Sequence, residues 1–154
     1  MFFYQTDIGK IGIAESDNAI MSLYFHGEDI PEDAVVHETE LLKEAGRQLQ
    51  DYLAGKRRDF TLPLAPAGTE FMLRVWEVLR AIPYGETRSY RKIAQITGNQ
   101  KASRALGLAN NRNPIPIFVP CHRVIGTNGK LTGYRGGLQT KERLLELEKQ
   151  HAAL

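Results

Sequence analysis

The strongest restriction on how this chain can fold comes from residues 113–124, whose sequence is Asn-Pro-Ile-Pro-Ile-Phe-Val-Pro-Cys-His-Arg-Val. Pro114, Pro116 and Pro120 each fix their own φ angle, remove a backbone donor and favour an extended conformation in the preceding residue. The residues between them are mostly apolar. We therefore predict a rigid, roughly extended segment that crosses the core and delivers Cys121 into a basic, glycine-rich region.

Cys121 is the only cysteine of the chain, which excludes an intramolecular disulfide and any metal site built from several cysteines. A single cysteine is usually a buried, small hydrophobic residue. The alternative is a nucleophile, because His122 and Arg123 can both lower the thiol pKa from its usual value of about 8.5. The residues alone leave both interpretations open.

Length and composition favour a folded protein without a membrane segment. A chain of 154 residues can bury a core as one large or two small domains. Its first residues lack the basic and apolar regions of a signal peptide, and no apolar run approaches the length of a membrane span. We expect a soluble protein of a reducing compartment, cytoplasmic in a prokaryote and nuclear in a eukaryote, with no membrane contact.

Charge is divided unevenly along the chain. Residues 1–67 contain 6 Lys and Arg against 12 Asp and Glu, whereas residues 68–154 contain 14 against 6. Such asymmetry is typical of a basic half that faces a polyanion and an acidic half that does not. We predict nucleic-acid contact by the second half; the alternative is two solvated faces of one domain.

The first 66 residues predict an acidic α/β domain. Apolar and polar residues alternate through residues 2–25, which predicts short strands joined by turns. From Thr39 apolar residues recur at spacings of three and four, which predicts a helix closed by Gly55. Nothing here indicates chemistry, so we interpret residues 1–66 as a support domain, with residues 61–68 as the linker.

Residues 67–154 predict a mainly helical domain. Thr69 is a suitable N-cap for a helix with one apolar face. A short helix capped by Ser89 is followed, after Gly98, by a second short helix at about residues 101–109. Two short helices joined by a glycine-containing turn are typical of a helix-turn-helix, although many such pairs bind nothing.

The second of these helices is unusual for one that reads bases. Its small residues let the backbone approach DNA closely, with Arg104 as the long donor. Such a helix favours sequence-independent contact and insertion over direct base readout. The residues of this helix expected to contact DNA are Ala102, Ser103, Arg104, Ala105 and Gly107.

The end of the chain predicts a glycine-rich loop and a last helix. The loop carries Tyr134 and Arg135, and the helix begins at about Gln139. Glu148 lies late in that helix, where a negative charge opposes the helix dipole. Two explanations of an acidic residue at this position stay open: Glu148 is exposed to solvent, or it has a buried partner such as His122.

Together these motifs resemble the O6-alkylguanine-DNA alkyltransferase family. The resemblance covers roughly residues 69–150, in several separated motifs of one order, whereas residues 1–66 match only in their layout. It implies an α/β protein of two small domains, an N-terminal RNase H-like α/β domain and a C-terminal, mainly α helix-turn-helix (winged-helix-like) domain. The motifs are Pro83-x-Gly85 through Tyr90, Arg104-Ala105-x-Gly107, Asn113-Pro114, Pro120-Cys121-His122-Arg123-Val124, Gly133-Tyr134-x-Gly136-Gly137 and Lys141…Leu144-Leu145…Glu148.

The resemblance implies DNA repair by direct reversal: an alkyl group moves once and irreversibly from O6-alkylguanine to Cys121, with O4-alkylthymine as a second candidate substrate. His122 is similar to the base that deprotonates the thiol through a water, and Glu148 to the residue that orients this histidine. Asn113 is similar to the residue that braces the active-site turn, and Tyr90 to the tyrosine beside the target phosphate and base. The displacement needs a thiolate, and the departing guanine needs a proton.

The alkylated base must also leave the helical stack to reach the sulfur. The resemblance implies that Arg104 fills the gap left by the flipped nucleotide. Arg123 is expected as a further DNA contact, and a bulky Arg135 is expected to narrow the pocket against groups larger than methyl. The expected pocket residues are Tyr90, Val119, Val124, Tyr134 and Arg135.

The expected partner is double-stranded DNA that contains alkylated bases, bound by a monomer, with several molecules along one duplex as an alternative. We expect no cofactor and no metal, because the first half has no cysteine to supply zinc ligands. One rival function is a DNA-binding module that senses lesions without chemistry; such proteins lack the acceptor cysteine. The other is a cysteine hydrolase, which adjacent Cys121 and His122 disfavour, since neighbours in an extended segment point to opposite sides.

Overall fold

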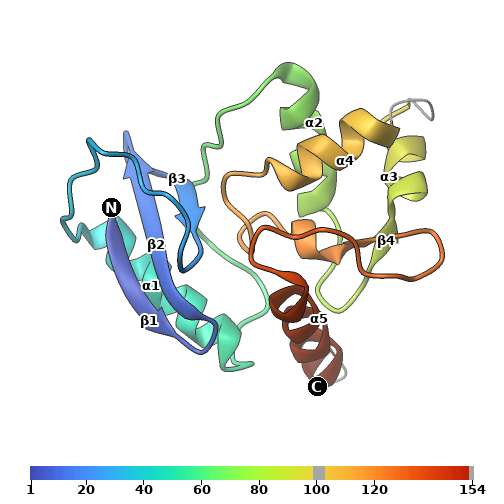
Figure 1. The fold of residues 1–154 in the computed structure, drawn as a ribbon. Coiled ribbons are helices and arrows are strands. Elements are labelled where there is room, and N and C mark those ends of the chain that lie inside the picture. Colours follow the sequence, from blue (N-terminus) through green and yellow to red (C-terminus); the bar gives the residue numbers. More distant parts are fainter. Residues whose placement is uncertain (99–102, 153–154) are drawn as a thin grey trace. The chain divides into compact units, whose positions relative to one another are not determined.

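The structure is a computed structural model that describes residues 1–98 and 103–152. The chain divides into two compact units, Met1–Pro66 and Ala67–Leu154. The first unit joins a small sheet to one helix, and the second is built mainly from helices (Figure 1). This confirms the predicted α/β class, with an α/β part followed by a mainly helical part.

A three-stranded antiparallel sheet forms one layer of the first unit, in the order β1-β2-β3. Asp17 and Asn18 make the two-residue turn before β3, and both have positive φ angles, 51° and 66°. Such turns match the right-handed twist of paired strands. The strands are β1 (Phe2–Thr6), β2 (Gly9–Ser16) and β3 (Ala19–Tyr24).

The helix α1 (Glu40–Leu53) packs against this sheet, as its spacing of apolar residues predicts. The hydroxyl of Thr39 accepts a hydrogen bond from the Leu42 amide and caps the first turn. Gly46 faces the ring of Tyr4 so closely that a Cβ atom there would lie 2.7 Å from it. Close packing of this helix on the sheet therefore requires a glycine at position 46.

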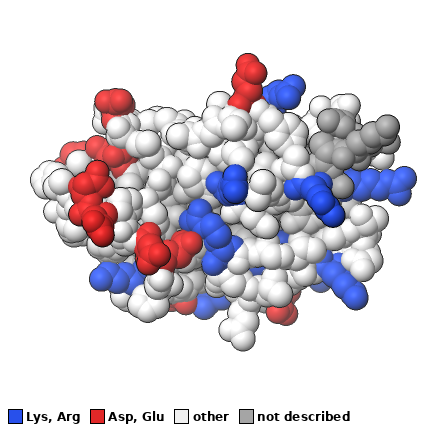
Figure 2. All heavy atoms as spheres, turned by 45° about the horizontal axis from the view of Figure 1, so that its top comes forward, with Lys and Arg blue, Asp and Glu red and all other residues white. Residues whose placement is uncertain are grey.

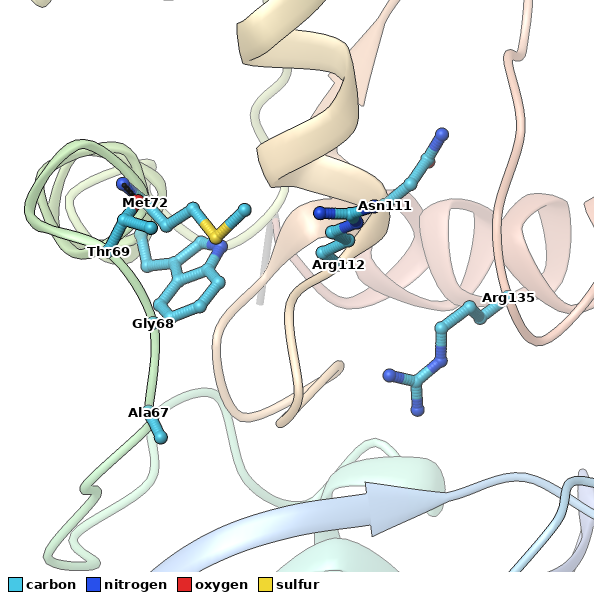
Figure 3. Close-up of a pocket in the computed structure, with 8 residues that line it drawn as sticks. Ala67, Gly68, Thr69, Met72, Asn111, Arg112 and Arg135 are labelled. Carbon is cyan, nitrogen blue, oxygen red and sulfur yellow. Dashed lines mark hydrogen bonds between the residues drawn. The ribbon is translucent and has the colours of Figure 1, made fainter.

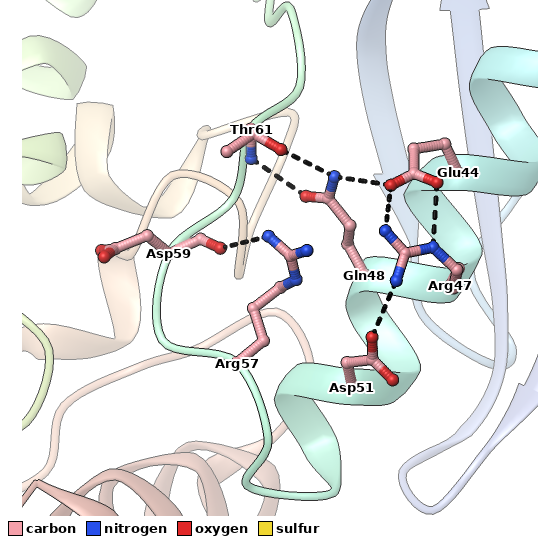
Figure 4. Close-up of polar contacts among 7 residues, drawn as sticks. All are labelled: Glu44, Arg47, Gln48, Asp51, Arg57, Asp59 and Thr61. Carbon is pink, nitrogen blue, oxygen red and sulfur yellow. Dashed lines mark hydrogen bonds and ion pairs between the residues drawn. The ribbon is translucent and has the colours of Figure 1, made fainter.

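The predicted linker at residues 61–68 is wrong in its first part, because residues 61–65 are bound within the first unit. The buried amide of Gln48 accepts from the Thr61 amide at 2.9 Å and donates to the Thr61 hydroxyl at 2.9 Å (Figure 4). Ile20 exchanges backbone hydrogen bonds with Pro63 and Ala65, both at 2.8 Å. These bonds give an extended segment the partners that a solvated linker would find in water.

Four helices dominate the second unit. Thr69 and Ser89 cap α2 and α3 as predicted, by accepting from the amides of Met72 and Lys92. A pair of short parallel strands, β4 and β5, ties the start of α3 to the chain after Cys121. The elements are α2 (Glu70–Arg80), β4 (Arg88–Ser89), α3 (Tyr90–Ile96), α4 (Ser103–Asn111), the 3-10 turn η1 (Cys121–Arg123), β5 (Val124–Ile125) and α5 (Leu138–His151).

The segment of residues 113–124 is buried as predicted, but it is not extended. The Val119 amide donates to the Ile115 carbonyl at 2.9 Å, so the chain reverses direction between these residues. Ile117 stands in the turn at φ 74°, which is a strained conformation for a β-branched residue. The side chain of Asn113 bonds to both ends of this turn. These bonds outweigh the extended preference that the prolines impose.

We predict that Gly46→Ala destabilises the protein by about 1–3 kcal/mol, because the added methyl group overpacks against the Tyr4 ring. In an unhindered helix the same change would stabilise by about 1 kcal/mol. Chemical denaturation measures the free energy of unfolding, and a Tyr4→Ala background is the control. There Gly46→Ala should cost much less; an equal cost in both backgrounds would show that the close approach to Tyr4 is not the cause.

Candidate functional site

Cys121 begins the 3-10 turn η1, in which three consecutive functional side chains are buried. Pro120, with φ −80° and ψ 64°, forms an inverse γ-turn before it. The Cys121 amide closes that turn by donating to the Val119 carbonyl at 2.8 Å. A tight turn followed by a single helical turn therefore carries the sulfur, and Cys121 is only 4% exposed.

Asn113 holds the chain that leads to the thiol. Its side-chain amide donates to the Val119 carbonyl at 2.8 Å, and its oxygen accepts from the Ile115 amide at 3.0 Å. The side chain is almost fully buried, so neither bond competes with solvent. The geometry is that of a brace across the turn immediately before Cys121.

Glu148 lies at the centre of a buried polar cluster. His122 Nε2 lies 2.7 Å from its Oε2, and Arg123 grips both oxygens through Nε at 2.8 Å and Nη2 at 2.9 Å. The Gly85 amide donates to Oε1 at 3.1 Å, and Arg123 Nη1 donates to the Ile82 carbonyl at 2.7 Å. Of the two explanations that the sequence leaves open for Glu148, exposure to solvent is wrong and a buried partner is confirmed.

The cluster has a defined protonation state. Burial alone would raise the pKa of Glu148, but the hydrogen bonds from His122 and Arg123, with the charge of Arg123, outweigh it and hold that pKa far below its usual range. Burial lowers the pKa of His122, and the charge of Arg123 adds to this, against the opposing effect of Glu148. A neutral imidazole beside a carboxylate must donate from Nε2, because a carboxylate only accepts. The acceptor nitrogen of His122 is therefore Nδ1.

Arg123, which the sequence analysis expected to contact DNA, is buried in the described structure. The residue is 7% exposed, and its guanidinium donates to Glu148 and to the Ile82 carbonyl. A phosphate contact would require these buried bonds to break. Because His122 is neutral, Arg123 is the permanent cationic partner of the carboxylate, a role that its sequence position beside the cysteine concealed.

The thiol of Cys121 does not behave as its two neighbours in sequence suggest. Burial raises its pKa above the ordinary value, and a hydrogen bond from Asn113 with the charges of Lys141 and Arg135 only partly offset this. The net direction is therefore opposite to the one expected from His122 and Arg123, of which one is neutral and the other is paired with Glu148.

Lys141 is a site residue that the sequence motif contained but that received no role. It is fully buried on α5, and its ammonium donates to the carbonyls of Val124 at 2.8 Å and Thr132 at 3.0 Å. Lys141, Leu144 and Glu148 recur at helical spacing on the buried face of α5. The spacing of three and four residues places Lys141 on the same helix face as the apolar Leu144, and this is the signal in the sequence that Lys141 is buried.

Tyr90 begins α3, and two residues that the sequence analysis missed surround its hydroxyl. Thr132 donates to the Tyr90 oxygen at 2.9 Å, and the side-chain amide of Asn110 donates to it at 3.4 Å. Thr132 belongs to the loop between β5 and α5, and Asn110 to α4. Three separate segments therefore meet at the phenol.

A hollow of about 780 Å³ lies in the second unit, beside the turn that Asn113 braces. Arg112 and Arg135 reach toward it from opposite sides (Figure 3). Arg135 Nη1 donates to the Asn113 carbonyl at 2.9 Å, so its guanidinium ties the loop to the turn. Of the expected pocket residues, Arg135 lines this hollow and the other four do not. Val119 and Val124 are buried, and Tyr90 and Tyr134 are partly buried.

The predicted pair of short helices is present as α3 and α4, which pack on each other and on α2. The indole of Trp76 in α2 donates to the Ala109 carbonyl at 2.9 Å, and this buried hydrogen bond ties α4 to α2. Arg104 and Ala105 are exposed on α4. Ala102 lies outside the described residues, and Ser103 is the first residue of α4.

Gly107 gives α4 a feature that its own fold does not need. A Cβ atom at this position would meet nothing within 4 Å. Glycine inside a helix costs about 1 kcal/mol relative to alanine. The helix therefore has open space at this position, and the DNA contact expected of Gly107 stays a prediction.

The charge division of the sequence is visible on the surface. Figure 2 keeps the left–right arrangement of Figure 1, and in it Asp and Glu gather over the first unit while Lys and Arg are spread over the second. Arg91 and Lys92, both exposed on α3, add to the basic surface of the helix pair. This supports a polyanion-facing second unit.

Residues 1–98 and 103–152 contain neither a membrane-spanning helix nor a cluster of metal ligands. No helix there is both long and apolar enough to cross a membrane. Within the same ranges, no group of three or more His, Cys, Asp or Glu side chains is arranged to hold a metal ion.

Family descriptions match both units of the chain. "6-O-methylguanine DNA methyltransferase, ribonuclease-like domain" matches residues 2–66, and "6-O-methylguanine DNA methyltransferase, DNA binding domain" matches residues 70–150. The two matches leave almost no part of the chain uncovered.

Curated relatives and solved structures match over nearly the whole length. The methylated-DNA–protein-cysteine methyltransferase of Methanosarcina acetivorans is 53% identical over 149 residues, 94% of this chain and 95% of its own. The constitutive enzyme of that name from Bacillus subtilis is 47% identical over 152 residues, 94% of this chain and 92% of its own. The crystal structure of Mycobacterium tuberculosis OGT in complex with DNA is similar with a TM-score of 0.91 and 43% identity, over 97% of this chain and 92% of that one.

We predict that Glu148→Gln lowers the free energy of unfolding at pH 7 by about 3–5 kcal/mol, because it leaves the buried charge of Arg123 unpaired. The pKa of Glu148 is lowered in the folded state, so its stabilising contribution is complete above the unfolded value of about 4.3 and is lost as the pH falls through the folded value. Denaturation of the wild type between pH 7 and pH 3 should show this loss.

The variant should lack that part of the pH dependence. Glu146→Gln, at an exposed position two residues earlier on α5, is the control and should stay within about 0.5 kcal/mol of the wild type. If the two variants are equally stable, the cluster does not hold the fold together.

Proposed function

Because the chain belongs to the 6-O-methylguanine DNA methyltransferase family, we propose that it repairs DNA by direct reversal, taking the methyl group of O6-methylguanine onto Cys121 and leaving guanine in the duplex. The observation that carries the proposal is the buried turn that joins the only cysteine to a His–Glu pair, in a chain matched by the family over both units. Longer alkyl groups and O4-alkylthymine are secondary candidate substrates.

The thiol needs a base, and His122 is the candidate. His122 carries its proton on Nε2, which donates to Glu148, and its Nδ1 is unprotonated. Through a bridging water, Nδ1 takes the proton of Cys121. The thiolate then attacks the methyl carbon, and the bond from that carbon to guanine O6 breaks. Glu148 stabilises the imidazolium that forms, in the way a carboxylate supports a catalytic histidine. Asn113 keeps the sulfur in line by holding the turn.

The electron pair left on guanine must be neutralised. Tyr90 is the candidate donor: its oxygen accepts from Thr132 and Asn110, so its own proton is available to a further acceptor. A proton passed to the ring of the departing guanine avoids a free anion. The proton that His122 took from the thiol then passes through solvent to the Tyr90 oxygen, so the products are S-methylcysteine and neutral guanine, with both side chains in their starting states.

The target base has to be turned out of the duplex, since its O6 substituent is stacked in the helix. We assign this step to α4. Gly107 and Ala105 let the helix backbone lie close to the DNA, and Arg104 occupies the space of the extruded nucleotide. Val119, Val124, Tyr134 and Arg135 with Tyr90 line the pocket that receives it.

The two units have separate tasks in this proposal. The basic second unit (67–154) binds alkylated duplex DNA and carries the transfer, and the acidic first unit (1–66) supports it. The protein acts as a monomer, without cofactor, in the compartment that holds the DNA. Several molecules along one duplex are compatible with contacts that do not depend on sequence.

The reaction should stop after one transfer per molecule. The thioether at Cys121 is stable, and the chain has no second thiol to regenerate it. Incubation with excess methylated duplex should raise the intact mass by one methyl group and then plateau, with the modified peptide containing Cys121. Cys121→Ser should bind the duplex and gain nothing. Sustained turnover, or a methyl group on another residue, would contradict the proposal.

Base extrusion makes a separate prediction for Arg104. Arg104→Ala should slow transfer from duplex DNA by about tenfold or more, because extrusion costs a few kcal/mol, yet leave transfer from the free base O6-methylguanine nearly unchanged. Single-turnover rates on the two substrates provide the measurement. Arg74→Ala, at an exposed position on α2, is the control. Equal losses on both substrates would assign Arg104 to folding.

A further inference from the structure

The charges around Cys121 do not balance. Arg123 and Glu148 form an ion pair without net charge, and His122 is neutral. Two further cations, Lys141 from α5 and Arg135 from the loop before it, act on the thiol. The site therefore has an excess of positive charge before the thiol ionises.

Lys141 is the more unusual of the two cations, because it is fully buried. Its ammonium donates only to the carbonyls of Val124 and Thr132, and within residues 1–98 and 103–152 no carboxylate pairs with it. Carbonyl oxygens solvate an ammonium but do not neutralise it, so its burial is costly. Burial lowers the pKa of Lys141, and the negative charge of a Cys121 thiolate opposes this by favouring the protonated ammonium.

Arg135 approaches the same turn from its solvent side. Its guanidinium donates to the Asn113 carbonyl at 2.9 Å, and Asn113 in turn holds Val119 two residues before the thiol. Arginine stays charged at any pH at which the protein is folded. Arg112 lines the same hollow as Arg135.

We propose that Lys141 and Arg135 are positioning residues of the transfer reaction: they hold the loop between β5 and α5 against the turn that carries Cys121 and supply the counter-charge of a buried thiolate. The proposal rests on the proposed function only in taking Cys121 as the acceptor. His122 removes the proton of the thiol, whereas the two cations stabilise the anion that remains.

The sign of the effect follows from two opposing causes. Burial raises the pKa of the Cys121 thiol, and the positive charges of Lys141 and Arg135 lower it. Removing either charge therefore raises the pKa further and reduces the thiolate fraction at neutral pH. Lys141 should have the larger effect, because water screens the exposed Arg135.

The test follows alkylation of the thiol by iodoacetamide against pH, in the full chain without DNA. The wild type should give a midpoint above about 8.5, the usual value, and Lys141→Met and Arg135→Gln should move it upward. Arg112→Gln is the matched control and should leave it unchanged. An unchanged midpoint in Arg135→Gln, whose exposed side chain puts folding at little risk, would overturn the part assigned to Arg135. The same result in folded Lys141→Met would overturn the part assigned to Lys141.

The single-turnover rate of methyl transfer provides a second readout. The two variants should lose about tenfold at pH 7 and recover toward the wild-type rate as the pH rises and the thiolate forms. A loss that is equal at every pH would overturn the proposal in favour of a purely structural role. If Lys141→Met does not fold, Lys141→Arg tests the same charge, and it should keep the wild-type midpoint.

These outcomes are independent of the proposed function. If the midpoints shift as expected but wild-type Cys121 gains no methyl group from methylated DNA, the proposed function fails and the electrostatic assignment stands. If wild-type Cys121 is methylated but no midpoint shifts, the proposed function stands and the electrostatic assignment fails.

Discussion

The buried carboxylate of Glu148 is the interaction on which the second unit depends. Isolated charges are very costly to bury, so the carboxylate can stay inside only because it is fully surrounded by donors. Those donors come from η1 and from the chain after α2, while Glu148 itself belongs to α5. One side chain therefore joins three segments that are far apart in sequence and fixes the turn that carries the thiol.

The same arrangement separates two tasks that the motif Cys-His-Arg places side by side. Arg123 stabilises the carboxylate, and its Nε, Nη1 and Nη2 each make a buried hydrogen bond to Glu148 or to the Ile82 carbonyl. His122 is left neutral, so it can accept a proton. The positive charge that favours a thiolate comes instead from Lys141 and Arg135, which lie 20 and 14 residues further along the chain. Neighbours in the sequence are thus not the electrostatic neighbours of the sulfur.

Much of this organisation could be predicted from residues alone. Periodicity and caps gave α1, α2 and α3, because local hydrogen bonds and one buried face decide such helices. The proline-rich segment was predicted to be extended, and this was wrong because the side chain of Asn113, at the start of the same segment, closes a turn in it. Arg123 marks a different limit: sequence spacing reports local geometry, whereas burial and ion pairing depend on which helix packs against the turn. For Lys141, the helical spacing of residues on α5 indicates burial, which membership of the family motif alone did not indicate.

The central claim is that burial and the charge of Arg123 keep His122 neutral, and that Glu148 fixes its tautomer, so that Nδ1 accepts the proton of the thiol. An NMR titration of the imidazole nitrogens, assigned by comparison with His122→Asn, tests this most directly. The account predicts a ring protonated at Nε2 alone, with a pKa below the usual value of about 6.5. A ring that carries its proton on Nδ1 at neutral pH, or that becomes positively charged above pH 6.5, would contradict it.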